Sequence, residues 1–231
     1  MLTASVAGFL AGLLHVFAGP DHLAALAPLS LRARGRAWAV GLRWGLGHSS
    51  GVLLVAAVAF GLRQVVSFKS LSGWGERLVG ATMIVLGLWG LRGLFRDRLH
   101  AHDHQHDGQS HVHFHVHRPD EDHRGASAHV HTHAAFWVGT LHGLAGTAHL
   151  AGVLPSLALP TGRETGGYLA AFALGTVLAM TTFAAAIGLA APGRTERGLR
   201  AYRWLLGGAS GLCALTGAAW IVLPLYGIPL P

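Results

Sequence analysis

Long apolar runs separated by short polar segments form the pattern along this chain of 231 residues. The runs without acidic residues occupy 2–18, 37–62, 78–95, 134–159, 167–191 and 204–226. Because a helix needs roughly 20 apolar residues to cross a bilayer, five of these runs predict spans directly. The first run is short, but the apolar trend resumes after Gly19-Pro20-Asp21-His22 and continues to Leu31. We therefore expect one broken helix over 2–31 and an all-α integral membrane protein with six spans.

The basic residues sort by loop. With six spans, the loops after the first, third and fifth spans share one side and carry all but four of the 17 Lys and Arg residues. This asymmetry predicts a prokaryotic inner-membrane protein with those loops in the cytoplasm and both termini outside. A signal peptide would need a basic region before its apolar core, and no basic residue precedes Arg32. The net charge of +7 is thus a topology signal and implies no nucleic-acid partner.

Residues 97–133 differ from the rest of the chain, because they hold twelve of its 17 histidines at alternating positions. Alternation is also typical of a strand, but we expect both faces to be polar and therefore a disordered loop. On the cytoplasmic side, this loop is either a weak metal reservoir or sensor, or a solvated linker. It divides the chain into a first membrane repeat at 1–96 and a second at 134–231.

The two flanking regions share an internal repeat. The stretch from Leu14 to Ala24, LHVFAGPDHLA, matches the stretch from Leu141 to Ala151, LHGLAGTAHLA. After a slip of one residue, Leu46-Gly47 also matches Leu174-Gly175. Because each half has three spans, the second half must be inverted relative to the first. The sequence thus predicts a 3+3 inverted repeat with a broken first helix in each half, an arrangement that builds substrate sites near the bilayer midplane.

The chemistry concentrates where the first helix breaks. Asp21 is the one carboxylate well inside an apolar run, and an intramembrane Asp costs about 2.5–3.5 kcal/mol to insert, so it needs a partner. His22 follows it directly. His15 lies seven residues before His22, which is roughly 10 Å along an unbroken helix, so the break must shorten the gap if both are to hold one ion. The competing interpretation is a kink with a hydrogen-bonded polar cluster.

Three more histidines lie in apolar runs. His48 falls in the middle of the second span, where a histidine is either a ligand or a packed core residue. His142 and His149 are the repeat counterparts of His15 and His22, and the alternative to a ligand role is that they orient the ligands from behind or relay protons. Imidazole with one carboxylate suits nickel, cobalt, copper and zinc. The single cysteine, Cys213, excludes a thiolate cluster, and we expect it to be a small buried hydrophobe.

These motifs resemble the nickel/cobalt transporter superfamily, and most of all its short urease-accessory-like branch with a histidine-rich loop. The carriers of the resemblance are His15 with Asp21-His22, the Leu-Gly-His-Ser element at Leu46–Ser49 and the His-Gly-Leu-Ala-Gly stretch at His142–Gly146. The long permeases have four residues between the first His and Asp-His, whereas this chain has five, and its second half lacks the Asp. The resemblance implies transport of Ni²⁺ or Co²⁺, with His15, Asp21, His22 and His48 as ligands and no prosthetic group.

The predicted function is therefore secondary transport of a divalent transition metal through a site of His15, Asp21, His22, His48, His142 and His149. The sequence does not choose between import and export. One alternative is a nickel-binding accessory protein for urease or hydrogenase maturation. Another is a membrane histidine-cluster metalloenzyme, but its histidine pairs two to four residues apart are missing from the spans, so we expect no enzyme. The expected partners are the ion and the bilayer, and a homo-oligomer or a cytoplasmic metallochaperone is compatible.

Overall fold

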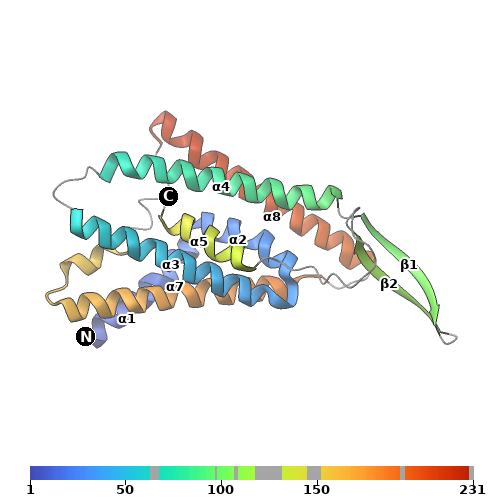
Figure 1. Ribbon diagram of the computed structural model, residues 1–231, viewed down its shortest axis with the longest axis horizontal. Helices are drawn as coiled ribbons and strands as arrows, with labels where there is room; N and C mark the ends of the chain where they lie inside the picture. The colour runs from blue at the N-terminus through green and yellow to red at the C-terminus, as the bar shows by residue number, and fades with distance from the viewer. Residues whose placement is uncertain are drawn as a thin grey trace.

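The structure is a computed structural model that describes residues 1–62, 68–96, 98–106, 109–117, 132–144, 152–192 and 196–228. Helices dominate these residues (Figure 1). The long ones are α1 (Leu2–Ala18), α2 (Pro20–Ala33), α3 (Ala37–Leu62), α4 (Phe68–Arg96), α5 (Thr132–Leu144), α7 (Gly162–Ala190) and α8 (Glu196–Val222). Three short 3-10 helices are η1 (Arg34–Arg36), η2 (Leu154–Ala158) and η3 (Leu223–Tyr226). Two strands, β1 (Arg98–His106) and β2 (Gln109–His117), lie between α4 and α5 in the chain.

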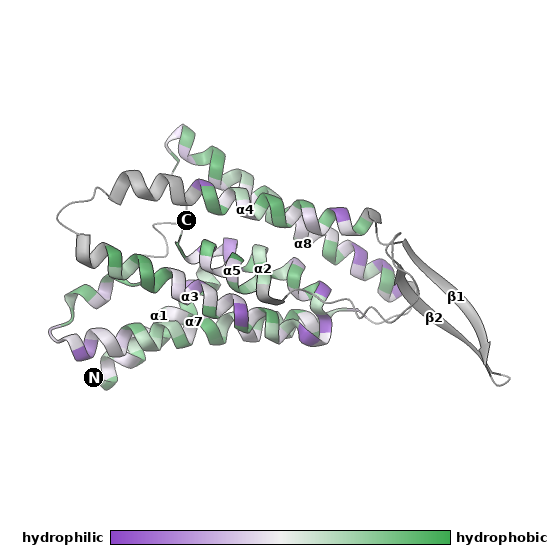
Figure 2. Ribbon diagram, viewed as in Figure 1, coloured by the Kyte–Doolittle hydropathy of each residue, from purple (hydrophilic) through white to green (hydrophobic). Residues whose placement is uncertain are grey.

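Several helices are long and apolar enough to cross a membrane. They cover Arg77–Leu94, Gly162–Ala190 and Arg197–Tyr226, and a fourth candidate is Leu2–Ala18 joined to the segment that begins at Pro20. Large apolar side chains point outward from these helices, with Leu189 84% exposed and Trp204 82% exposed, as expected where lipid replaces water. Figure 2 shows apolar residues along most of the length of α4, α7 and α8. The predicted all-α membrane protein is confirmed, while six spans remain a prediction.

The predicted break in the first helix lies at Gly19. This residue has an extended backbone, with φ −90° and ψ 102°, between the end of α1 and the beginning of α2. Pro20 occupies the first position of α2, where a missing N–H removes no helical hydrogen bond. The segments on either side are bent by 73°. The corresponding break expected in the second half falls in 145–151, outside the described residues.

Glycines bring α3 and α5 into backbone contact. Gly47 and Gly51 on α3 face the main chain of α5, and Gly139 and Gly143 on α5 face the main chain of α3. A Cβ added at any of the four would overlap a carbonyl oxygen of the opposite helix. Small residues four apart on both partners are the usual means of close helix approach in membranes, where van der Waals packing and interhelical hydrogen bonds replace the hydrophobic effect. This crossing places the residues next to Gly47 and Gly143 near each other.

Part of the histidine-rich segment forms two strands. Residues 98–106 and 109–117 pair as an antiparallel hairpin, shown at the far end of the molecule in Figure 1. Its register sets three histidines of β1 opposite three of β2, pairing His100 with His115, His102 with His113 and His104 with His111. The histidines of both strands occupy every second position, and the positions between them hold Leu99, Ala101, Asp103 and Gln105 in β1 and Ser110, Val112, Phe114 and Val116 in β2. The predicted loop also covers residues outside those that the structure describes, and its disorder stays a prediction.

The beginning of α7 has a side-chain cap. The Thr161 hydroxyl oxygen accepts a hydrogen bond from the Glu164 backbone N–H at 3.3 Å, and the hydroxyl donates to Glu164 Oε2 at 3.0 Å. We expect Thr161→Ala to lower the free energy of unfolding by about 1 kcal/mol, because an unsatisfied N–H is left at the helix end. Chemical unfolding in detergent measures this. Thr182→Ala, in the middle of the same helix, is the control and should cost clearly less.

Candidate metal centre

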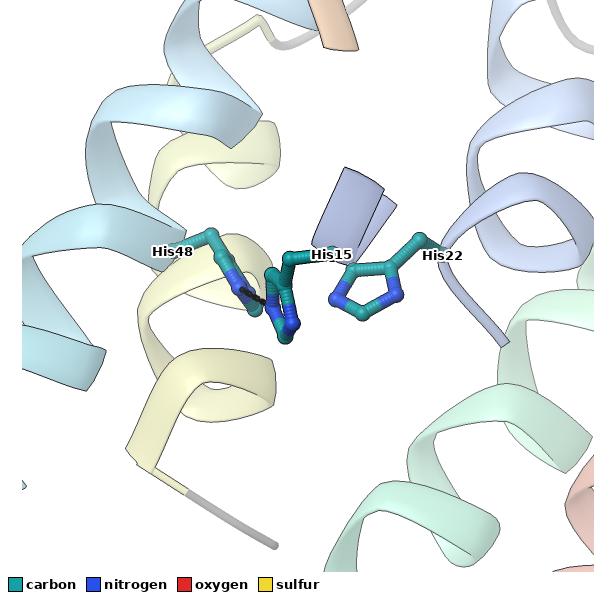
Figure 3. Close-up of side chains that lie close together, drawn as sticks. All are labelled: His15, His22 and His48. Carbon is teal, nitrogen blue, oxygen red and sulfur yellow. Dashed lines mark hydrogen bonds between the residues drawn. The ribbon is translucent and has the colours of Figure 1, made fainter. Parts of the chain in front are cut away.

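Five of the six predicted site residues lie together in the membrane region. His15 comes from α1, Asp21 and His22 from the first turn of α2, His48 from α3 and His142 from α5. Figure 3 shows the rings of His15, His22 and His48 directed toward one another from three different segments. His15 Nε2 lies 3.3 Å from His48 Nε2. Asp21 reaches two histidines, with Oδ1 3.1 Å from His22 Nδ1 and Oδ2 2.9 Å from His142 Nε2.

The break at Gly19 makes this convergence possible. The ring centroids of His15 and His22 are 4.7 Å apart, against roughly 10 Å along the axis of an unbroken helix. Gly19 also leaves room for the ring, since a Cβ at this position would overlap His22 Nδ1 and lie 2.8 Å from Asp21 Oδ1. Local chain geometry and the absence of a side chain at residue 19 therefore shape the site.

Two groups of three side chains could each hold an ion. One consists of His15, His22 and His48, and the other of Asp21, His22 and His142. Within each group the ligand atoms lie within 4.8 Å of one another. His22 belongs to both groups. The first group offers three neutral imidazoles, and the second offers two imidazoles and a carboxylate.

The cluster is enclosed. Asp21, His22, His48 and His142 are each at most 2% exposed, and His15 is half-buried. Burying a polar side chain costs free energy unless it has a partner, so these side chains must bind one another or an ion. The mutual contacts are consistent with either outcome, and the ligand roles stay a prediction. His149, the sixth predicted ligand, lies outside the described residues.

Two aromatic residues beside the cluster were not singled out from the sequence. The Trp44 ring centroid lies 5.9 Å from that of His142, and the Phe172 centroid lies 5.5 Å from that of His15. Both side chains are almost fully buried. A signal was present in the sequence, because Trp44 stands one helical turn before His48, and Phe172 stands at the matching repeat position. Cys213 is fully buried, with its thiol donating to the Met83 carbonyl at 3.3 Å, as predicted for a small hydrophobe.

Comparison with sequence families places this arrangement among known membrane proteins. The family described as cytochrome C biogenesis protein transmembrane region matches residues 3–212. The chain belongs to this family. Membership covers all of the helices that contribute to the cluster. It agrees with the membrane spans of the structure and does not by itself identify a metal.

Three proteins are similar to this chain in sequence over most of its length. Chloroplast protein FOR GROWTH AND FERTILITY 1 from Arabidopsis thaliana is 33% identical over 99% of this chain, and chloroplast protein FOR GROWTH AND FERTILITY 2 from the same organism is 33% identical over 100% of this chain. The chain spans only 61% and 59% of those two proteins. Urease accessory protein UreH from Bacillus sp. (strain TB-90) is 28% identical over 82% of this chain and 78% of its own length. No solved structure matches.

Proposed function

We propose that this protein transports a divalent transition-metal ion, nickel or cobalt first, across a membrane through the cluster of His15, Asp21, His22, His48 and His142. The observation that carries the proposal is the convergence of four imidazoles and a carboxylate from four helices inside an apolar bundle. Ionisable residues inside membranes mark substrate and ion pathways. The cluster is the substrate site in this proposal, and the ion is the cargo.

The donor set supports the choice of metal. Imidazole nitrogen is a good donor for nickel, cobalt, copper and zinc, whereas magnesium and calcium require mainly oxygen ligands. Copper(I) favours thiolates, which the cluster lacks. The relationship to a protein named a urease accessory protein, together with the sequence motifs of the nickel/cobalt transporter superfamily, favours nickel as the first candidate.

The helix pairing supports the inverted repeat that this mechanism needs. In the repeat, α1, α3 and α4 correspond to α5, α7 and α8. Exchanging the halves converts the α1–α7 pair into the α5–α3 pair and returns α4–α8 to itself, and all three pairs pack together. Such a pattern is expected when two inverted halves are related by a pseudo-two-fold axis.

Single contacts repeat in the same way. Gly12 on α1 lies against the carbonyl of Phe172 on α7, and Gly139 on α5 lies against the carbonyl of Trp44 on α3. Gly139 follows Gly12 by 127 residues, and Phe172 follows Trp44 by 128. The sequence repeat has the same two offsets, with 127 residues between His15 and His142 and 128 between Leu46 and Leu174. The site lies where the two related crossings meet, and ion release would follow a change in their relative position.

Flux into sealed vesicles tests the proposal. Purified protein reconstituted in liposomes should move labelled Ni²⁺ and Co²⁺, and His22→Ala and Asp21→Ala should lower the flux at least tenfold. Ser30→Ala is the matched control, because Ser30 is a buried polar residue of the same helix whose hydroxyl donates to the Leu26 carbonyl of that helix at 2.8 Å. Unchanged flux in both ligand variants would refute the site, and magnesium flux as fast as nickel flux would refute the metal class.

The direction of transport is a separate question, which the histidine-rich segment can answer. We propose that it lies on the cytoplasmic side and binds metal there. A chain without residues 100–133 should show a change in cellular metal tolerance if the protein exports, and a change in metal accumulation from low external concentrations if it imports. Equal tolerance and equal accumulation would show that the segment is only a linker.

A second function is favoured by the name of one relative. If this protein, like UreH by its name, is an accessory protein, it would bind nickel and pass it on without moving it across the membrane. Reconstituted vesicles separate the two functions. Tight nickel binding with no flux in intact vesicles would favour the accessory function and exclude the transporter.

A further inference from the structure

We propose that the cluster holds one ion in two alternative positions that share His22, and that the ion moves by exchange from one position to the other. The inference rests on the proposed transport function and adds the route within the site. The first position consists of His15, His22 and His48, and the second of Asp21, His22 and His142. We refer to them as the trihistidine position and the acidic position.

The trihistidine position has the spacing of ligands around an ion. Two ligands at about 2.0–2.1 Å from a tetrahedral ion are roughly 3.3–3.4 Å apart. His15 Nε2 and His48 Nε2 are 3.3 Å apart. The His22 ring centroid is 4.7 Å from that of His15 and 4.8 Å from that of His48, so the third ring closes the triangle. In Figure 3 the His22 ring lies edge-on toward the other two.

Asp21 supports this position without binding the ion. Asp21 Oδ1 lies 3.1 Å from His22 Nδ1, so the carboxylate stands beside one ring nitrogen, and the other nitrogen, Nε2, would bind the ion in the trihistidine position. This is the carboxylate–histidine–metal arrangement that orients metal-binding rings. The other carboxylate oxygen, Oδ2, accepts from His142 Nε2 at 2.9 Å. While the ion is in the trihistidine position, the acidic position therefore consists of the hydrogen bond between His142 and Asp21 and the close approach of Asp21 to His22.

The same contacts become metal bonds when the ion moves. One nitrogen of His22, one oxygen of Asp21 and one nitrogen of His142 are within 4.8 Å of one another, and the distances to Asp21 are those of His22 Nδ1 and His142 Nε2. Each ring then carries its proton on the opposite nitrogen, so both histidines stay neutral and no proton is lost overall. A neutral imidazole has a single nitrogen lone pair, and His22 can serve only one position at a time. Occupancy of the two positions is therefore mutually exclusive, and His22 remains bound or near the ion throughout the exchange.

Accessibility and charge give the two positions different characters. His15 is the one half-buried member of the five, so the trihistidine position is the more accessible one and adds no charge to the ion. The acidic position is buried on every side, next to Trp44, and its carboxylate neutralises half of the charge of a dication. An ion that loses its water shell is stabilised by a carboxylate in a low-dielectric region. When the ion moves to the acidic position, it thus loses water and has part of its charge neutralised by Asp21 in the same step.

Cobalt binding to full-length protein tests the inference. The twelve histidines between residues 100 and 133 are replaced by glutamine, so that bound cobalt reports on the intramembrane cluster. We compare the parent with His48→Ala, which removes a trihistidine ligand, with His142→Ala, which removes an acidic ligand, and with His22→Ala. Equilibrium dialysis gives the number of ions and the affinity, X-ray absorption gives the nitrogen and oxygen ligands, and vesicle flux is measured in parallel.

The parent should bind one cobalt ion per chain. His48→Ala and His142→Ala should each still bind one ion, the first with a carboxylate oxygen in the coordination shell and the second with imidazole nitrogen only. His22→Ala should weaken binding by a further 10- to 100-fold, and all three should lose flux. His48→Gln and His142→Gln replace any alanine variant that fails to fold.

Two ions per parent chain would overturn the inference, because His22 cannot serve both positions at once. Equal weakening by all three substitutions with the same coordination shell would also overturn it, since that result indicates a single five-ligand position. Absence of flux in the protein with its histidine-rich segment unchanged, together with the expected binding pattern, would instead contradict the transport function and leave the two positions established.

Discussion

Gly19→Ala should lower metal flux on the order of 10- to 100-fold. We expect a loss as large as that caused by removing a ligand, although the substitution changes no ligand residue. The added Cβ would overlap His22 Nδ1 and lie 2.8 Å from Asp21 Oδ1. Both side chains must then turn away, and His22 leaves the orientation in which it faces His15. Vesicle flux and cobalt affinity measure the effect.

The control for this substitution is Gly35→Ala. Gly35 lies in the turn after α2, and a Cβ there meets nothing within 4 Å. The two variants add the same methyl group to neighbouring bends of the chain, so a general effect of stiffening would appear in both. A flux of Gly19→Ala equal to that of Gly35→Ala would show that the His22 ring does not depend on the space at residue 19.

Gly143→Ala should destabilise the protein by about 1–3 kcal/mol and reduce flux as well. Its Cβ would overlap the carbonyl oxygen of His48, so α3 and α5 must separate along their crossing. Because His142 is the neighbour of Gly143, the same displacement moves His142 and His48 apart. Denaturant unfolding in detergent and vesicle flux measure the two consequences.

Gly211→Ala provides the contrast within a membrane helix. A Cβ at Gly211 of α8 meets nothing within 4 Å, and alanine is the better helix former, so stability should be unchanged or rise by up to about 1 kcal/mol. If Gly143→Ala behaves like Gly211→Ala, the close approach of α3 and α5 is not what holds the site together.

The break and its polar residues were predictable because they violate local rules. An aspartate in an apolar run and a glycine-proline pair inside a helical run both require a special environment, and each is visible in a short window of sequence. The buried partner of Asp21 was not predictable in the same way. His142 is 121 residues away and reaches Asp21 only because glycines allow α5 to lie against α3, which is a property of the packed helices.

The hairpin shows the opposite case. Its alternation of histidine with other residues is visible in the sequence, and the register of the two strands follows it. In β2 the residues between the histidines are Val112, Phe114 and Val116, so the period of two separates histidine from apolar residues and favours a strand.

The helix pairs also govern the order in which the molecule is completed during synthesis. The first helix ends at Ala18, but α7, against which its Gly8 and Gly12 pack, begins only at Gly162. At about 5–20 residues per second, α1 waits in the bilayer for on the order of 10 s before its partner emerges. During that interval its glycine face and His15 are exposed to lipid. The newly inserted chain is therefore most open to mispairing or degradation before its second half arrives, and a nascent chain truncated before α7 should lack both a packed α1 and an enclosed cluster.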